Sequence, residues 1–148
     1  MSVVTRYINF DTRGNTDIID ITDDVSMEVR QSGIKDGIIM VFASGSTVAV
    51  TTIEYEPGLV SDLTQALERI APQDIEYRHN QRWHDGNGHS HVRASLIGQS
   101  ESFPIIDGEI ALGTWQQIIC IDLDNRPRSR RLIVQIVGDK TTLEMKNI

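Results

Sequence analysis

Two histidines spaced two residues apart are the side chains of this sequence best suited to chemistry. They lie in Asn87-Gly88-His89-Ser90-His91-Val92-Arg93-Ala94-Ser95-Leu96. A strand alternates its side chains between two faces, so a strand over residues 87–96 would place His89, His91 and Arg93 on one face. Two such imidazoles can bind a divalent metal, and the guanidinium beyond them suits a phosphate or carboxylate. The segment therefore predicts an anion-handling pocket that could also hold a metal.

Other polar side chains follow strand-like or loop-like patterns and are candidates for the same pocket. Two-residue alternation places Glu54 on the same strand face as Val48, Val50 and Thr52. There it could form a wall of the pocket, act as a catalytic acid or base, or orient a metal-bound histidine through its carboxylate. Hydroxyl or backbone donors near a phosphate would come from Ser46 and Thr47. We also predict that Arg93 binds an anion, with a salt bridge to an acidic neighbour as the alternative.

The elements that must position these residues form a mostly antiparallel pattern with two helices. Strands are expected over residues 3–10, 16–20, 37–43, 48–54, 114–122 and 131–137, besides the one over 87–96. The first two should form an opening hairpin, and Asp107-Gly108 should join a second hairpin over 103–106 and 109–112. Helices are expected from Thr22 to Gly33 and over 59–70. Residues 77–88 are polar and rich in breakers, as in a loop.

Length and composition favour an ordinary soluble protein. The 148 residues, 39% hydrophobic and 24% charged, suit one domain over residues 1–148 with a sizeable core. Neither a membrane-spanning run nor a signal peptide is recognisable, which favours the cytoplasm. The formal net charge of −7 argues against nucleic acid bound across a broad surface, despite the basic run from Arg126 to Arg131. The single cysteine, Cys120, excludes a multi-cysteine zinc site.

Several longer motifs carry a resemblance to a known family. They are Thr51-Thr52-Ile53-Glu54-Tyr55-Glu56-Pro57-Gly58-Leu59, Tyr77-Arg78-His79, Gly88-His89-Ser90-His91-Val92-Arg93-Ala94-Ser95-Leu96-Ile97-Gly98, Leu112-Gly113-Thr114-Trp115-Gln116-Gln117-Ile118 and Arg130-Arg131. Together and in this order, these motifs resemble the YjbQ family, also called UPF0047. The resemblance implies an α+β fold, mostly an antiparallel β-sandwich with two or more helices, assembled as a homotrimer with sites near subunit boundaries.

The resemblance also implies a function. Family members resemble thiamine-phosphate synthases, which join a pyrimidine diphosphate to a thiazole phosphate. On this basis Glu54 and His91 are the predicted catalytic residues, and Ser46, Thr47, Arg93 and Gln116 are predicted to bind a small phosphorylated metabolite. Two alternatives stay open: a metal-dependent hydrolase of such a metabolite, and a non-catalytic trimer that binds a metal or an anion. A third is that the histidines only join subunits.

The sequence departs from the family pattern at its histidines. Many relatives carry a histidine-threonine pair where this chain reads Gly45-Ser46, and some have proline at the position of His89. If the site needs three imidazoles, His79, His89 and His91 could restore the count, and with a water they would make an open zinc site. Diphosphate chemistry more often uses magnesium with oxygen ligands, so the predicted cofactor is a divalent metal, zinc or magnesium.

Overall fold

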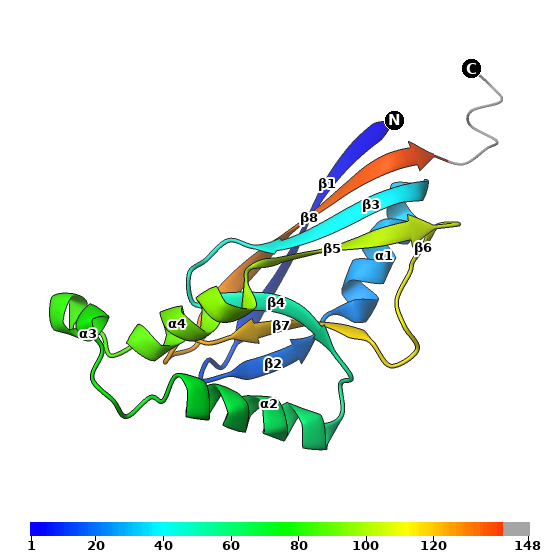
Figure 1. Cartoon of the computed structure of the whole chain (residues 1–148). Helices are drawn as coiled ribbons and strands as arrows, with labels where there is room; N and C mark the ends of the chain where they lie inside the picture. The colour runs from blue at the N-terminus through cyan, green and yellow to red at the C-terminus, as the bar shows by residue number, and fades with distance from the viewer. Residues whose placement is uncertain (141–148) are drawn as a thin grey trace.

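Two antiparallel sheets and four helices make up residues 1–140 of the computed structural model, which are the residues the structure describes (Figure 1). The larger sheet has the order β1-β8-β3-β5-β6 and the smaller one β2-β7-β4. The larger sheet consists of β1 (Ser2–Thr12), β8 (Arg128–Lys140), β3 (Ile34–Ala43), β5 (Ser100–Ile106) and β6 (Glu109–Ile110). The smaller sheet consists of β2 (Asp17–Asp20), β7 (Gln117–Asp122) and β4 (Val48–Ile53). The helices are α1 (Thr22–Ser32), α2 (Pro57–Ile70), α3 (Arg78–Trp83) and α4 (Gly88–Ile97).

The smaller sheet is the middle layer of the molecule and is buried on both faces. On one face, Val48, Val50 and Cys120 pack with α1 and the larger sheet. On the other face, Ala49, Ile119 and Ile121 pack with Leu67 of α2 and Ala94 of α4. A strand covered on both sides has no polar face, which explains the continuous apolar runs in β4 and β7. The α+β sandwich expected from the sequence is therefore confirmed.

Helix α2 is the element that the sequence predicted best. Its apolar residues recur at helical spacing, and Pro57 occupies the first turn, where the missing N–H costs nothing. The Glu56 carboxylate accepts hydrogen bonds from the backbone N–H of Gly58 and Leu59 at 2.7 and 2.8 Å. These bonds lower the pKa of Glu56. Glu56 thus starts the helix, and α2 covers the smaller sheet below β2 and β7 in Figure 1.

The predicted opening hairpin is wrong. Strand β1 pairs with β8 in the larger sheet, whereas β2 pairs with β7 in the smaller one. The residues between them, Gly14, Asn15 and Thr16, have positive φ, and Asn15 N–H donates to the carbonyl of Asp124 at 2.6 Å. The turn chemistry therefore moves the chain from one sheet to the other instead of folding it back. The Asp107-Gly108 hairpin is confirmed, with Ile106 opposite Glu109.

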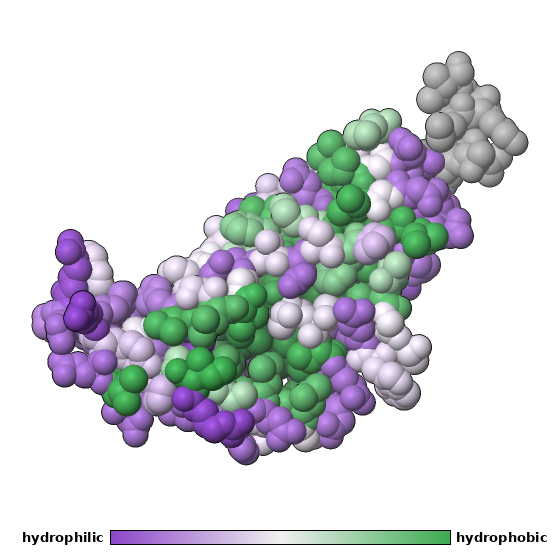
Figure 2. Space-filling model, viewed as in Figure 1, coloured by the Kyte–Doolittle hydropathy of each residue, from purple (hydrophilic) through white to green (hydrophobic). Residues whose placement is uncertain are grey.

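The predicted strand over 87–96 is also wrong, because these residues form helix α4. The helix buries His89, Ser90, Arg93 and Ala94. Val92 and Leu96 are exposed, and apolar surface gathers over this helix in Figure 2. A helix with a polar buried face lacks the apolar stripe by which helices are usually recognised. The alternation that suggested a strand was therefore a coincidence of residue types. Within residues 1–140, no helix is both long and apolar enough to cross a membrane.

Candidate functional site

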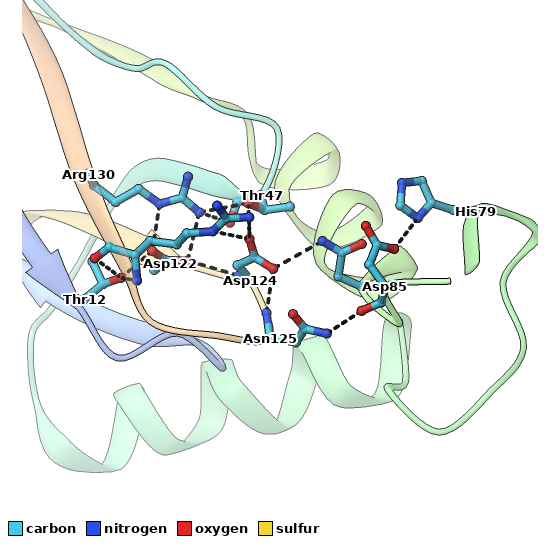
Figure 3. A network of polar contacts seen from close by, with 10 residues as sticks. Thr12, Thr47, His79, Asp85, Asp122, Asp124, Asn125 and Arg130 are labelled. Atoms are coloured by element: carbon cyan, nitrogen blue, oxygen red, sulfur yellow. Dashed lines mark hydrogen bonds and ion pairs between the residues drawn. The ribbon is translucent and has the colours of Figure 1, made fainter. Parts of the chain in front are cut away.

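Two imidazoles lie side by side where α3 meets α4. The ring centroids of His79, from α3, and His91, from α4, are 4.3 Å apart. Asp85, in the loop between the helices, places Oδ1 at 3.6 Å from Nδ1 of His79 (Figure 3). The short helix α3 was not predicted, and it places His79 here. The structure thus brings two of the three predicted histidines together beside a carboxylate.

The pKa of His91 is lower than that of a free imidazole, so its ring is neutral over a wider pH range. Burial lowers its pKa first, the neighbouring His79 lowers it further, and Asp85 and Asp124 oppose the shift. A neutral imidazole is the form that accepts a proton or ligates a metal. His91 is therefore suited to either role near neutral pH.

Asp124 is the buried centre of the polar network next to the histidines. Its carboxylate accepts from Asn87 Nδ2 at 3.2 Å, from Asn125 N–H at 2.8 Å and from Arg128 Nε at 2.7 Å. Burial alone would raise its pKa, but these hydrogen bonds and the charge of Arg128 outweigh burial and hold the pKa at about 2. Asp124 is thus a permanent anion at neutral pH, and it fixes Asn87 at the start of α4.

A second buried carboxylate, Asp122, continues the network into the sandwich (Figure 3). Arg130 donates to it through Nε at 2.7 Å and Nη2 at 3.0 Å, and the Thr12 hydroxyl donates at 2.5 Å. Thr47 links the two carboxylates, since it accepts from Arg130 at 2.8 Å and donates to Asp124 at 3.3 Å. The two aspartates and two arginines form a charge-balanced network under the site.

His89 lies away from the other two histidines. Successive residues of a helix are about 100° apart around its axis, so residues two apart point in different directions. His89 is 2% exposed and faces Tyr77, with ring centroids 6.4 Å apart. Burial and the charge of Arg93 lower its pKa, and Glu68 and Asp124 oppose that shift. The shared strand face that motivated grouping His79, His89 and His91 does not exist.

The guanidinium group of Arg93 makes contacts that hold neighbouring elements together. Its Nε donates to the carbonyl of Ala71 at 3.0 Å, Nη1 to the Thr16 hydroxyl at 3.1 Å and Nη2 to Glu68 at 2.5 Å. All three nitrogens are therefore used in joining α4 to α2 and to the β1–β2 loop. The contact with Glu68 is the salt bridge that the sequence analysis gave as the alternative to anion binding. Arg93 is therefore not assigned to the site at the histidine pair.

The remaining predicted residues lie at opposite ends of β4. Thr47 precedes the strand and belongs to the network, and Ser46 is exposed in the same loop. Glu54 follows the strand, is exposed, and is seven residues from Thr47, or roughly 20 Å at the usual rise per residue. Gln116 lies at the same end as Glu54 and donates to Thr52 at 3.0 Å. Within one chain, Glu54 and Gln116 therefore do not reach a small ligand bound at His91.

Sequence patterns provide little reason to single out the residues that the network adds. Asp122 is the last residue of the apolar strand β7 and Asp124 follows it, and Arg128 and Arg130 come six residues after Asp122 and Asp124 respectively. An apolar run that ends in Asp-x-Asp and returns with Arg-x-Arg is a signal that could have located them. Charged residues at strand ends are usually solvent-exposed, so the residue types alone do not predict this burial.

Four buried polar atoms without a hydrogen-bond partner surround the same region. In the part of the chain that the structure describes, they are His79 Nδ1, Asn87 Oδ1, His89 Nδ1 and Ser90 Oγ. Buried polar atoms are nearly always paired, and exceptions gather at functional sites. All four lie on α3, α4 or the loop between them, which supports a functional role for this end of the molecule.

The histidine pair does not by itself complete a metal centre. Across residues 1–140, no group of three or more His, Cys, Asp or Glu side chains is arranged to hold a metal ion. As they are placed within that range, the side chains supply too few ligands for zinc or magnesium, so the metal stays a prediction that requires His79, His91 and Asp85 to move closer together.

Asp124 should make the protein acid-sensitive in a defined range. Its pKa of about 2 in the folded state lies below the ordinary value of 3.8 for an aspartate, so it stabilises the fold above about pH 4. That contribution, roughly 2 kcal/mol, should be lost as the pH falls from 4 to 2. Urea unfolding at both pH values should show a smaller loss for Asp124→Asn than for the wild type. An equal loss in both proteins would contradict this assignment.

Fold and site together define an α+β sandwich protein with a histidine pair above a buried aspartate–arginine network. The model of the UPF0047 protein YjbQ-like family matches residues 6–139. The chain belongs to this family.

Curated relatives and solved structures agree with this membership. A UPF0047 protein of Methanothermobacter thermautotrophicus is 42% identical over 93% of this chain and 94% of its own length. Another from Archaeoglobus fulgidus is 37% identical over 84% of this chain and 94% of its own length. The crystal structure of a YbjQ-like protein of unknown function from Sulfolobus solfataricus has a TM-score of 0.84 and 31% identity. The match covers 93% of this chain and 100% of the Sulfolobus chain.

Proposed function

We propose that the protein is a cytoplasmic enzyme that acts on a small phosphorylated metabolite at the His79–His91 pair. The reaction proposed for the first assay is thiamine-phosphate synthesis from a pyrimidine diphosphate and a thiazole phosphate. The observation that carries the proposal is the pair itself, two imidazoles 4.3 Å apart beside Asp85. A neutral imidazole held near a carboxylate is the usual group for proton transfer at neutral pH.

The residues divide the work as follows. His91 accepts a proton, because burial lowers its pKa and favours the neutral imidazole, and the protonated ring returns that proton in a later step. His79 holds the ring of His91 from one side and itself lies next to Asp85. Asn87 and Asp124 fix the first turn of α4 and therefore the position of His91. Glu54 and Gln116, at the far end of β4, act only if another copy of the chain brings them to this site.

Replacing His91 by asparagine should lower turnover by about 10²–10⁴-fold, which is the usual contribution of one general acid or base. The measurement is formation of thiamine phosphate, followed by phosphate release from a panel of phosphorylated metabolites. The matched control is His84→Asn, because His84 is exposed and has a φ of 57°, which asparagine tolerates. The control should keep wild-type turnover.

Each outcome of this assay separates the competing functions. Turnover lost in His91→Asn, with the fold and subunit number retained, supports catalysis. Equal turnover in His91→Asn and the wild type would show that His91 is not a catalytic residue. Saturable binding of the phosphorylated substrates by a wild type that turns over none of them would favour a non-catalytic binding protein.

A metal at the same place is the second candidate. It is favoured by His79 Nδ1, which is buried, has no hydrogen-bond partner and lies 3.6 Å from a carboxylate oxygen. We propose zinc bound by His79, His91 and Asp85 after their side chains rotate towards one another, in place of the set that included His89. Such a protein would be a metal-dependent hydrolase, or a magnesium-dependent transferase if the substrate is a diphosphate.

Metal content per chain tests this candidate directly. Protein purified without an affinity tag should carry near-stoichiometric zinc, and His79→Asn/His91→Asn should lose it. His89→Gln should retain the metal, because His89 faces Tyr77 instead. Loss of zinc in His89→Gln alone would restore the original three-histidine set, and negligible zinc in all proteins would refute the metal.

The homotrimer that the family resemblance implies is part of the same proposal. The larger sheet exposes Val3, Ile38 and Ile106, and exposed apolar surface of this kind often forms a subunit contact. Light scattering should give three chains per particle. If His91→Ala changes the number of chains per particle while the turnover per folded chain stays the same, the histidines join subunits and do not catalyse.

A further inference from the structure

Strand alternation divides the basic run at the start of β8 into two groups. Arg128 and Arg130 point into the sandwich, where Asp124 and Asp122 neutralise them. Ser129 and Arg131 alternate with them and are exposed on the outer face of the sheet. Among the three arginines of this part of β8, Arg131 alone points outward, so its role differs from that of Arg128 and Arg130.

Arg131 is held in a fixed orientation by an aromatic ring. Its guanidinium carbon lies 3.7 Å from the ring centroid of Tyr7, on the neighbouring strand β1. Within residues 1–140, no carboxylate is close enough to form an ion pair with Arg131, whereas Arg128 and Arg130 both have one. Stacking occupies a face of the guanidinium and leaves the N–H groups at its edge for another partner.

A hollow of about 380 Å³ lies beside this guanidinium. Register places Asn9 opposite Arg131 and Asp11 opposite Ser129, and these four residues line the hollow together with Phe10 and Arg130. Asn9 and Ser129 add an amide and a hydroxyl to the wall. Asp11 adds a negative charge at the Ser129 end, where it accepts from that hydroxyl at 2.7 Å.

We propose that this hollow binds a carboxylate through Arg131, at a site separate from the histidine pair. A planar guanidinium edge matches the two oxygens of a carboxylate, and Asn9 can donate a further hydrogen bond. Asp11 selects against phosphate, because a second negative charge on the ligand is repelled more strongly than a single one. The carboxylate belongs either to a free small acid or to an acidic side chain of a second copy of this chain.

The test follows the Arg131 Nε–H resonance by NMR while acetate or inorganic phosphate is added at low ionic strength. Acetate should shift this resonance saturably and at lower concentration than phosphate. Arg131→Gln should weaken acetate binding by about ten- to a hundredfold, followed through the backbone N–H signals of Asn9 and Ser129. Arg126→Gln, which removes an exposed arginine from the loop that precedes β8, should leave acetate binding unchanged.

Asp11→Asn should strengthen anion binding, which is the opposite of the effect expected for Arg131→Gln. Asparagine keeps an oxygen that accepts from Ser129 but removes the charge, so both anions should bind more tightly and phosphate should gain more. A series of protein concentrations without added anion separates the two sources of the carboxylate. A shift of Arg131 that grows with protein concentration, and that acetate reverses, indicates a second copy.

A concentration-independent baseline with a saturable acetate response indicates a free acid. The proposal is overturned if neither acetate nor protein concentration shifts the Arg131 resonance saturably, or if Arg131→Gln binds acetate as the wild type does.

Discussion

Replacing Asp122 by alanine should lower the free energy of unfolding by about 3–5 kcal/mol. The Asp122 side chain is fully buried, and its partner Arg130 is only 11% exposed. The substitution leaves the guanidinium buried without its anion and also removes the acceptor of Thr12. Urea unfolding at neutral pH measures the change.

Two further variants separate the ion pair from simple loss of packing. Asp122→Leu/Arg130→Met removes both charges and should recover part of the stability lost in Asp122→Ala, because no charge is left unpaired. Arg30→Gln breaks the exposed pair with Glu109 and should cost less than about 1 kcal/mol. If Asp122→Ala costs no more than Arg30→Gln, the buried network does not stabilise the fold.

Gly37→Ala should destabilise the larger sheet by about 3 kcal/mol or more. Gly37 of β3 is paired with Gly138 of β8, and the two backbones approach closely. A Cβ added to Gly37 would lie 2.1 Å from the carbonyl oxygen of Val137 and 2.7 Å from Cα of Gly138. Backbone atoms on a paired strand cannot move aside without opening the β3–β8 ladder, so the loss should appear in thermal or urea unfolding.

Gly113→Ala is the matched control for this effect. A Cβ at Gly113 would meet only the Gln116 side chain, at 3.6 Å and beyond, and its φ is not positive. The change should stay within about 0.5 kcal/mol, as for most surface substitutions. An equally mild Gly37→Ala would mean that the β3–β8 ladder adjusts to an added methyl group.

The strands, helix α2 and the second hairpin could be predicted because local signals and tertiary packing agree there. β4 and β7 are apolar because both faces are covered, and α2 has a start signal, helical spacing and a stop. The first hairpin was mispredicted because turn residues indicate that the chain changes direction but not which strand it then pairs with. Long-range pairing selects β8 for β1.

Helix α4 was mispredicted for a different reason. Two-residue alternation and helical spacing can coexist in ten residues, and here the buried face is polar. Residue types therefore predicted chemistry at His79 and His91, but the wrong backbone grouped them with His89 and Arg93. The aspartates beneath the site were missed because their burial depends on Arg128 and Arg130, which come later in the chain. The prediction of one domain over residues 1–148 stays a prediction.

The polar underside of α4 also bears on the order in which the molecule loosens. Residues His89, Ser90 and Arg93 gain less from leaving water than an apolar face would, so α4 is held to the sandwich less strongly than an apolar helix face of the same size would be. Segments with weak apolar anchorage open first under native conditions. The end that carries His91 should therefore exchange its amide protons ahead of the strands beneath it. A molecule bound between α3 and α4 would slow that opening and would be detectable by exchange protection before its chemistry is known.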